Sequence, residues 1–101
     1  MVEKFKIKLN QSELDVLYQV LQVAISMNPE QMITKVYVAE MVDLYKKVLL
    51  KWTCPKEMNT VVMTAAQAIS FYLLFNSYFN SNIHTHITIN TICNTIHKQY
   101  C

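Results

Sequence analysis

Hydrophobic residues and lysines alternate at the start of the chain. Phe5, Ile7 and Leu9 are each separated by a lysine within residues 3–9. A period of two is typical of a β-strand with one buried face, because successive side chains point to opposite sides of a sheet. The lysines would then face solvent, where they also protect an edge strand from pairing with other chains. The pattern predicts a strand over residues 3–9.

The hydrophobic period changes to that of a helix after Asn10. Apolar residues recur three and four positions apart from Leu14 onward, which gives a helix an apolar face. The Asn10 side chain can accept a hydrogen bond from a free backbone N–H, and Glu13 can reach back to the N–H of Asn10. This capping box and the periodicity together predict a helix over residues 11–27.

Two prolines divide the middle of the chain into two further predicted helices. Asn28 and Pro29 suit a helix start, and the following residues have an apolar face and a charged face, which predicts a helix over residues 29–52. After Pro55 the apolar residues fall on all sides of a helical wheel. Such a helix is buried from several directions, so we expect a central helix over residues 56–79.

The last part of the chain can be interpreted in two ways. Isoleucine alternates with histidine and threonine over residues 83–89, which indicates a second short strand that could pair with residues 3–9. The same residues could instead begin the last helix, which is otherwise predicted over residues 91–100 with Asn90 as its cap. The predicted fold class is therefore mainly α: a single domain over residues 1–101, with an N-terminal strand, three or four helices and a central apolar helix.

Composition excludes several classes of protein. The chain has no glycine, so it cannot build the glycine-rich loops that hold phosphate in nucleotide-binding proteins. Hydrophobic residues make up 52% of the chain, which is too apolar for a disordered protein. The uncharged stretch at residues 58–79 is long enough to span a bilayer, but its many polar side chains argue against a membrane partner. The absence of an apolar leader and the three widely spaced cysteines favour a cytoplasmic protein with reduced thiols.

The number and positions of the lysines bear on whether the chain could bind nucleic acid. The net charge is only +2 and there is no arginine, the residue that best recognises phosphates and guanine, so nucleic acid is a disfavoured partner. Two separate groups of lysines would attract phosphate weakly. The first group is Lys4, Lys6 and Lys8, and the second is Lys46, Lys47, Lys51 and Lys56.

Histidine and cysteine gather near the C-terminus and make the weak candidate metal site. Its candidate ligands are His86, Cys93, His97 and Cys101. Cys93 and His97 are four residues apart and would share a helix face, where a thiolate and an imidazole could bind one ion. No Cys-x-x-Cys pair accompanies them, and no acidic residue lies nearby to orient a histidine beside a thiol nucleophile. We therefore expect no metal, no cofactor and no enzymatic activity.

Aromatic residues are concentrated toward the end of the predicted central helix. Aromatic side chains are enriched in the cores of protein interfaces, and a chain of this size buries only about two-thirds of its unfolded surface. The strand over residues 3–9 could also pair with its own copy or add to the sheet of a partner. The candidate interface residues are Phe5, Ile7, Phe71, Tyr72, Phe75, Tyr78 and Phe79.

These observations predict a non-catalytic helical module with an accessory or structural role. We expect it to be a homo-oligomer, most simply a homodimer, or to bind another protein. The alternative is a DNA-associated accessory or regulatory protein. A metal-binding protein and a small membrane protein are the lower alternatives.

Overall fold

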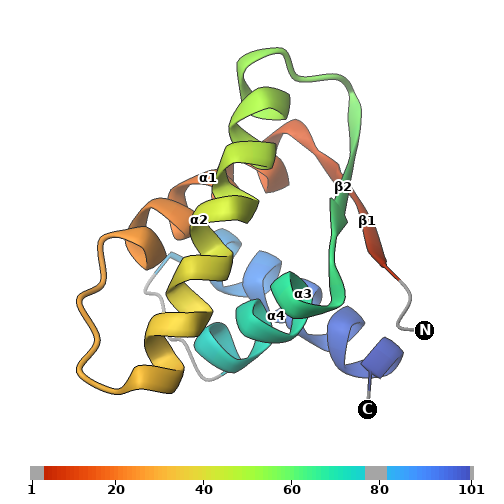
Figure 1. Ribbon diagram of the computed structural model, residues 1–101. Coiled ribbons are helices and arrows are strands. Elements are labelled where there is room, and N and C mark those ends of the chain that lie inside the picture. Colours follow the sequence, from red (N-terminus) through yellow and green to blue (C-terminus); the bar gives the residue numbers. More distant parts are fainter. Residues whose placement is uncertain (1–3, 77–81, 101) are drawn as a thin grey trace.

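The computed structural model describes residues 4–76 and 82–100 and has six elements in the order β1–α1–α2–β2–α3–α4 (Figure 1). The elements are β1 (Phe5–Asn10), α1 (Gln11–Ile25), α2 (Met32–Thr53), β2 (Met58–Met63), α3 (Ala65–Phe75) and α4 (Ile83–Tyr100). The predicted fold class is confirmed, because the protein is mainly helical with an N-terminal strand. No described residue has a positive φ.

The two strands form an antiparallel sheet although α1 and α2 separate them in the sequence. Phe5 lies opposite Met63 and Leu9 lies opposite Asn59. The helical pair α1–α2 is therefore inserted between two strands that close onto each other (Figure 1). Helix α3 follows β2 directly and packs against both α2 and α4.

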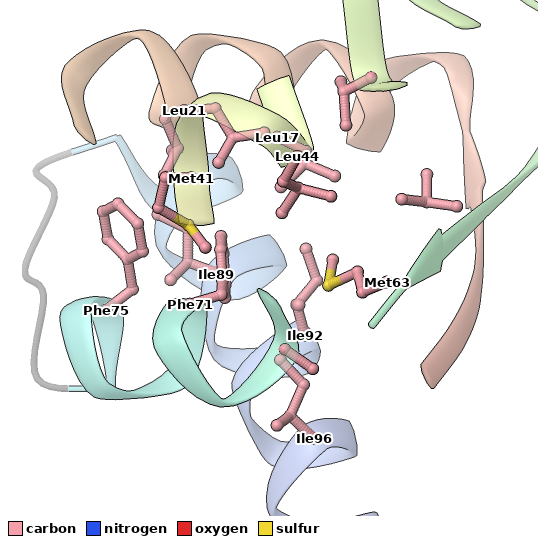
Figure 2. Packing of buried hydrophobic residues seen from close by; sticks show 14 of the residues in the cluster. Leu17, Leu21, Met41, Leu44, Met63, Phe71, Phe75, Ile89, Ile92 and Ile96 are labelled. Atoms are coloured by element: carbon pink, nitrogen blue, oxygen red, sulfur yellow. The ribbon is translucent and has the colours of Figure 1, made fainter. Parts of the chain in front are cut away.

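All six elements contribute to one hydrophobic core, part of which is shown in Figure 2. The labelled residues are Leu17 and Leu21 of α1, Met41 and Leu44 of α2, Met63 of β2, Phe71 and Phe75 of α3, and Ile89, Ile92 and Ile96 of α4. Each of these side chains is at most 2% exposed. Complete burial of a side chain of this size stabilises a fold by about 1.5–3 kcal/mol, so the core holds the helices on the sheet.

The first two predicted elements are confirmed. The backbone N–H of Glu13 donates to Asn10 Oδ1 at 2.8 Å, and the N–H of Asn10 donates to Glu13 Oε1 at 3.0 Å. This is the predicted capping box, and it joins the end of β1 to the start of α1. Helix α1 ends at Ile25, two residues before the predicted boundary.

The predicted start of the second helix is wrong. Helix α2 begins at Met32 and not at Pro29, and Gln31 is its N-cap without a side-chain hydrogen bond. Asn28 and Pro29 belong instead to the connection between α1 and α2. The chain has to reverse between two helices that pack together, and residues 26–31 are used for that turn.

The predicted central helix over residues 56–79 is wrong in its first part. Residues 58–63 form β2, with Asn59, Val61 and Met63 buried and the residues between them more exposed. Helix α3 begins only after Thr64, which forms a second capping box with Gln67 through hydrogen bonds of 3.0 and 3.1 Å. Pairing with β1 satisfies the backbone of β2, which explains why this segment is extended.

The predicted second strand near residues 83–89 is wrong in its position, because the second strand is β2. Residues 83–89 form the beginning of α4, as the other interpretation of this segment predicted. The helix predicted over residues 91–100 therefore starts eight residues earlier, at Ile83. Asn82 caps its first turn by accepting a hydrogen bond from the N–H of Thr85 at 3.1 Å. Ile89 and Ile92 share the buried face of this helix, and that packing favours helix over strand.

Candidate binding groove between α2 and β2

The structure places three of the seven predicted interface residues inside the molecule. Phe5, Phe71 and Phe75 are fully buried, and the rings of Phe71 and Phe75 lie with centroids 4.8 Å apart. A partner cannot reach these rings while the fold is intact. Ile7 and Tyr72 are partly buried, whereas Tyr78 and Phe79 lie outside the described residues.

The candidate metal ligands that the structure describes do not form a group that could hold a metal ion. Cys93 is buried, and the His97 ring is turned to Tyr72 with centroids 5.7 Å apart. His86 shares a hydrogen bond of 3.2 Å with Asn90, and Cys101 lies outside the described residues. Within the described part of the chain, no three side chains of His, Cys, Asp or Glu are grouped so that they could hold a metal ion.

The environment of Cys93 makes its thiol unreactive at neutral pH. Burial raises the pKa of Cys93 to about 12, because the thiolate would lose its hydration in the core. Both a nucleophile and a metal ligand have to be thiolates. Cys54, by contrast, is exposed at the end of α2.

We expect iodoacetamide to alkylate Cys54 and to spare Cys93 in the folded protein at a pH of about 8. The raised pKa of Cys93 and its burial both protect it, and unfolding in urea removes both effects. Mass spectrometry of the digested protein reports each cysteine on its own peptide. Equal alkylation rates for Cys54 and Cys93 without urea would contradict this placement of Cys93.

A hollow on the described surface lies between α2 and β2. Two adjoining cavities of about 300 and 490 Å³ share Leu50 and Lys51. We call them together the α2–β2 groove. It is lined by Lys47, Leu50, Lys51, Cys54, Lys56, Met58, Asn59, Thr60, Val61 and Val62. Figure 1 shows the connection after α2 passing over to the start of β2, so this connection borders one end of the groove.

Aromatic stacking holds the helical wall of the groove in place. The Trp52 ring stacks on Tyr18 with centroids 4.2 Å apart, and Tyr18 stacks on Tyr45 at 5.4 Å. Trp52 Nε1 also donates to Asp15 Oδ1 at 3.0 Å. Helical spacing places Trp52 on the face of α2 opposite Leu50. The end of α2 is therefore fixed to α1 on one side and presents Leu50 to the groove on the other.

Asn59 holds the bordered end of the groove together. Its side chain is 4% exposed, and its Oδ1 accepts from the N–H of Lys56 at 2.9 Å. Its Nδ2 donates to the carbonyl of Lys56 at 2.9 Å and to that of Leu9 at 3.3 Å. One buried amide thus joins the α2–β2 connection to both strands, and no local pattern in the sequence marks this residue.

Lys47 holds the other end of the groove. Its ammonium donates to Gln67 Oε1 at 3.0 Å and to the carbonyl of Val62 at 3.4 Å. The side chain therefore bridges α2, the edge of β2 and the first turn of α3. It also places a positive charge at this end of the groove.

The fold brings three lysines of the second predicted group to one side of β2 and two lysines of the first group, Lys6 and Lys8, to the other. Lys47, Lys51 and Lys56 line the α2–β2 groove. Across the sheet, the lysines of β1 are exposed and lie opposite Val62 and Thr60 in the strand register. No Asp or Glu is among the described residues that line the groove. The groove therefore combines positive charge with Leu50, which is 75% exposed.

A smaller cavity of about 170 Å³ lies between α3 and α4. It is lined by Ile69, Tyr72, Leu73, Ile96, His97 and Tyr100. Tyr72 is thus the predicted interface residue that lies beside a surface hollow. No charged lysine or carboxylate is among the described residues that line this cavity, so it has less chemistry to select a partner than the α2–β2 groove.

Comparison with known proteins adds no family to this description. A scan against protein-family models found no match, and searches of curated proteins and of solved structures found no significant match either. Among the helices that the structure describes, none is both long and apolar enough to cross a membrane.

Proposed function

We propose that this protein is a non-catalytic interaction module that binds a partner protein through the α2–β2 groove. The observation that carries the proposal is the position of Leu50, which is 75% exposed in a hollow that two lysines and two valines also line. An apolar centre with a charged rim is the usual anatomy of a protein interface. Burial of a leucine under a partner would stabilise a complex by about 1.5–3 kcal/mol.

The groove favours a protein over DNA as its occupant. DNA binding depends on neutralising many phosphates, usually on a convex or extended basic surface, and gains little from an exposed leucine. Arginine, which is best suited to read base edges, is absent from the chain. A peptide can instead place an apolar side chain on Leu50 and its charges on Lys51 and Lys56. DNA association and self-association are therefore outcomes that the experiment has to distinguish.

We expect random peptides selected on the wild-type protein to depend on Leu50. Leu50→Asp replaces the apolar centre with a carboxylate and should weaken selected peptides by about tenfold or more, as for a central interface residue. The matched control is Ile83→Asp on α4, because Ile83 is 75% exposed like Leu50 and lines neither cavity of the groove. Fluorescence anisotropy of labelled peptides measures the affinity for each variant.

Three results would contradict the proposal. The first is a selection that enriches no peptide, and the second is equal affinity of the selected peptides for wild type and Leu50→Asp. The third is a short DNA duplex that binds more tightly than any peptide and is insensitive to Leu50→Asp. Light scattering on the same samples reports whether a second copy of the chain occupies the groove instead.

A further inference from the structure

The backbone groups that face the α2–β2 groove can be identified from the strand register. In an antiparallel pair, residues alternate between those whose N–H and C=O point at the partner strand and those whose groups point away. Asn59 Nδ2 reaches the carbonyl of Leu9, so that carbonyl points toward β2 and the Leu9–Asn59 pair faces inward. Thr60 follows Asn59, and Val62 lies two residues beyond Thr60. By this alternation, both residues direct their backbone N–H and C=O groups away from β1.

An independent hydrogen bond supports this assignment. The Val62 carbonyl accepts from Lys47 Nζ, and Lys47 lies on α2 rather than on β1. The outer edge of β2 therefore faces the groove. In the described sheet β2 has β1 as its one strand neighbour, so no second strand occupies this edge.

The two outer edges of the sheet differ in their protection. Strand β1 carries lysines at alternate positions, and the side chain of Gln99 donates to the carbonyl of Lys4 at its outer edge. Lysines of this kind prevent unwanted strand pairing. Strand β2 has no charged residue of its own between Met58 and Met63. The outer edge of β2 thus has one lysine contact, from Lys47 to the Val62 carbonyl, and the rest of this edge, at Thr60, lines the groove.

We infer that the segment bound in the groove is an extended acidic peptide that adds to the outer edge of β2 as a third strand. This inference rests on the proposed function and specifies its partner. Strand addition obtains affinity from backbone hydrogen bonds, and side chains alternate between the two faces of the added strand. One set of side chains would contact Leu50, and the other set, bearing carboxylates, would face Lys51 and Lys56.

The charge around the groove determines the chemistry of this peptide. Lys47, Lys51 and Lys56 line the groove without an acidic neighbour among the described lining residues. Glu57 is exposed beside Lys56 and lines neither cavity. An acidic strand would pair with the lysines, whereas a basic strand would meet like charges at each of them.

The probe is a short capped peptide in which glutamate and valine alternate, compared with a peptide in which lysine replaces glutamate. We expect the glutamate peptide to bind about tenfold or more tightly than the lysine peptide, and its affinity to fall as salt is added. Backbone N-methylation separates strand pairing from side-chain contact. Two methylated peptides are compared, one with every valine amide methylated and one with every glutamate amide methylated. One of the two should bind about tenfold or more weakly than the parent peptide, because only one set of amides faces β2.

Hydrogen exchange gives a second measurement on the protein itself. Bound peptide should slow exchange of the Thr60 and Val62 amides, whereas the Ile7 amide, which faces the β1–β2 ladder, should not change.

The inference is overturned if the glutamate peptide fails to bind, if the lysine peptide binds equally well, or if both methylated peptides bind like the parent. The inference is also overturned if a DNA duplex displaces the bound peptide at a lower concentration than added free peptide needs to displace it. If peptides from the random selection still depend on Leu50, the proposed function stands without the strand addition. If no such peptides are found, both the proposed function and the strand addition are overturned.

Discussion

Replacement of Phe71 with alanine should destabilise the protein by about 3–5 kcal/mol. Phe71 is fully buried, and its ring packs on Phe75 in the part of the core where α2, α3 and α4 meet (Figure 2). Removal of the ring loses its burial and leaves a cavity that the surrounding helices fill only in part. Domains of this size are stable by only about 5–15 kcal/mol, so the loss is a large fraction of the total. Urea unfolding followed by circular dichroism measures it.

Leu73→Ala is the matched control on the same helix. Leu73 is 45% exposed, so its truncation should change the free energy of unfolding by about 0.5 kcal/mol or less. The pair of variants also separates a core role from an interface role for Phe71. A loss of less than about 1 kcal/mol in Phe71→Ala, with association weakened instead, would show that the ring serves a partner.

The second large effect is expected at Asn59. Asn59→Ala leaves the backbone N–H and carbonyl of Lys56 and the carbonyl of Leu9 without the amide that binds them. Loss of a partner to a buried polar group costs about 1–3 kcal/mol, so we expect a loss in this range for this site. Urea unfolding measures the loss. Hydrogen exchange at the Lys56 amide should become faster even where the rest of the fold is intact.

Asn94→Ala provides the comparison for Asn59. Asn94 is exposed on α4, and its truncation should change stability by about 0.5 kcal/mol or less. Equal effects of the two substitutions would show that Asn59 does not hold the α2–β2 connection. Because this connection borders the groove, Asn59→Ala should also weaken peptides that depend on Leu50.

The elements that were predicted correctly carry their signals within a few residues. Residues 3–9 alternate cleanly, and Asn10 and Glu13 form a capping box that spans three positions. The interactions that decide these structures are local. Sequence reasoning can therefore place the first strand and the first helix without knowledge of the rest of the fold.

The elements that were predicted wrongly depend on distant partners. β2 lies in an uncharged run that looks like a continuous helix, and its pairing partner is far away in sequence, as Val61 opposite Ile7 illustrates. The alternation over residues 83–89 is broken by tertiary packing: Ile83 and Ile87 are exposed, while Ile89 is buried. The periodicity of a short apolar segment does not determine which partner it meets.

The candidate groove was not predictable for the same reason. Leu50 appeared only as one apolar position of a long helix, and the two lysine groups appeared unrelated. Their common surface exists because β2 is extended beside α2. Aromatic composition was also a poor guide to the surface, since Phe71 and Phe75 have the same chemistry in a core as at an interface.

The backbone without positive φ has a consequence for the unfolded chain. The sequence contains no glycine, and no described residue has a positive φ. A glycine replaced by alanine at a compatible site stabilises a protein by about 0.4–1 kcal/mol, chiefly because the unfolded chain has fewer conformations to lose. An average chain of this length would carry about seven glycines. The unfolded chain of this protein therefore has a lower backbone entropy and loses less of it on folding. The hydrophobic core of this small domain then has to provide less stabilisation, even with a groove left open on the surface.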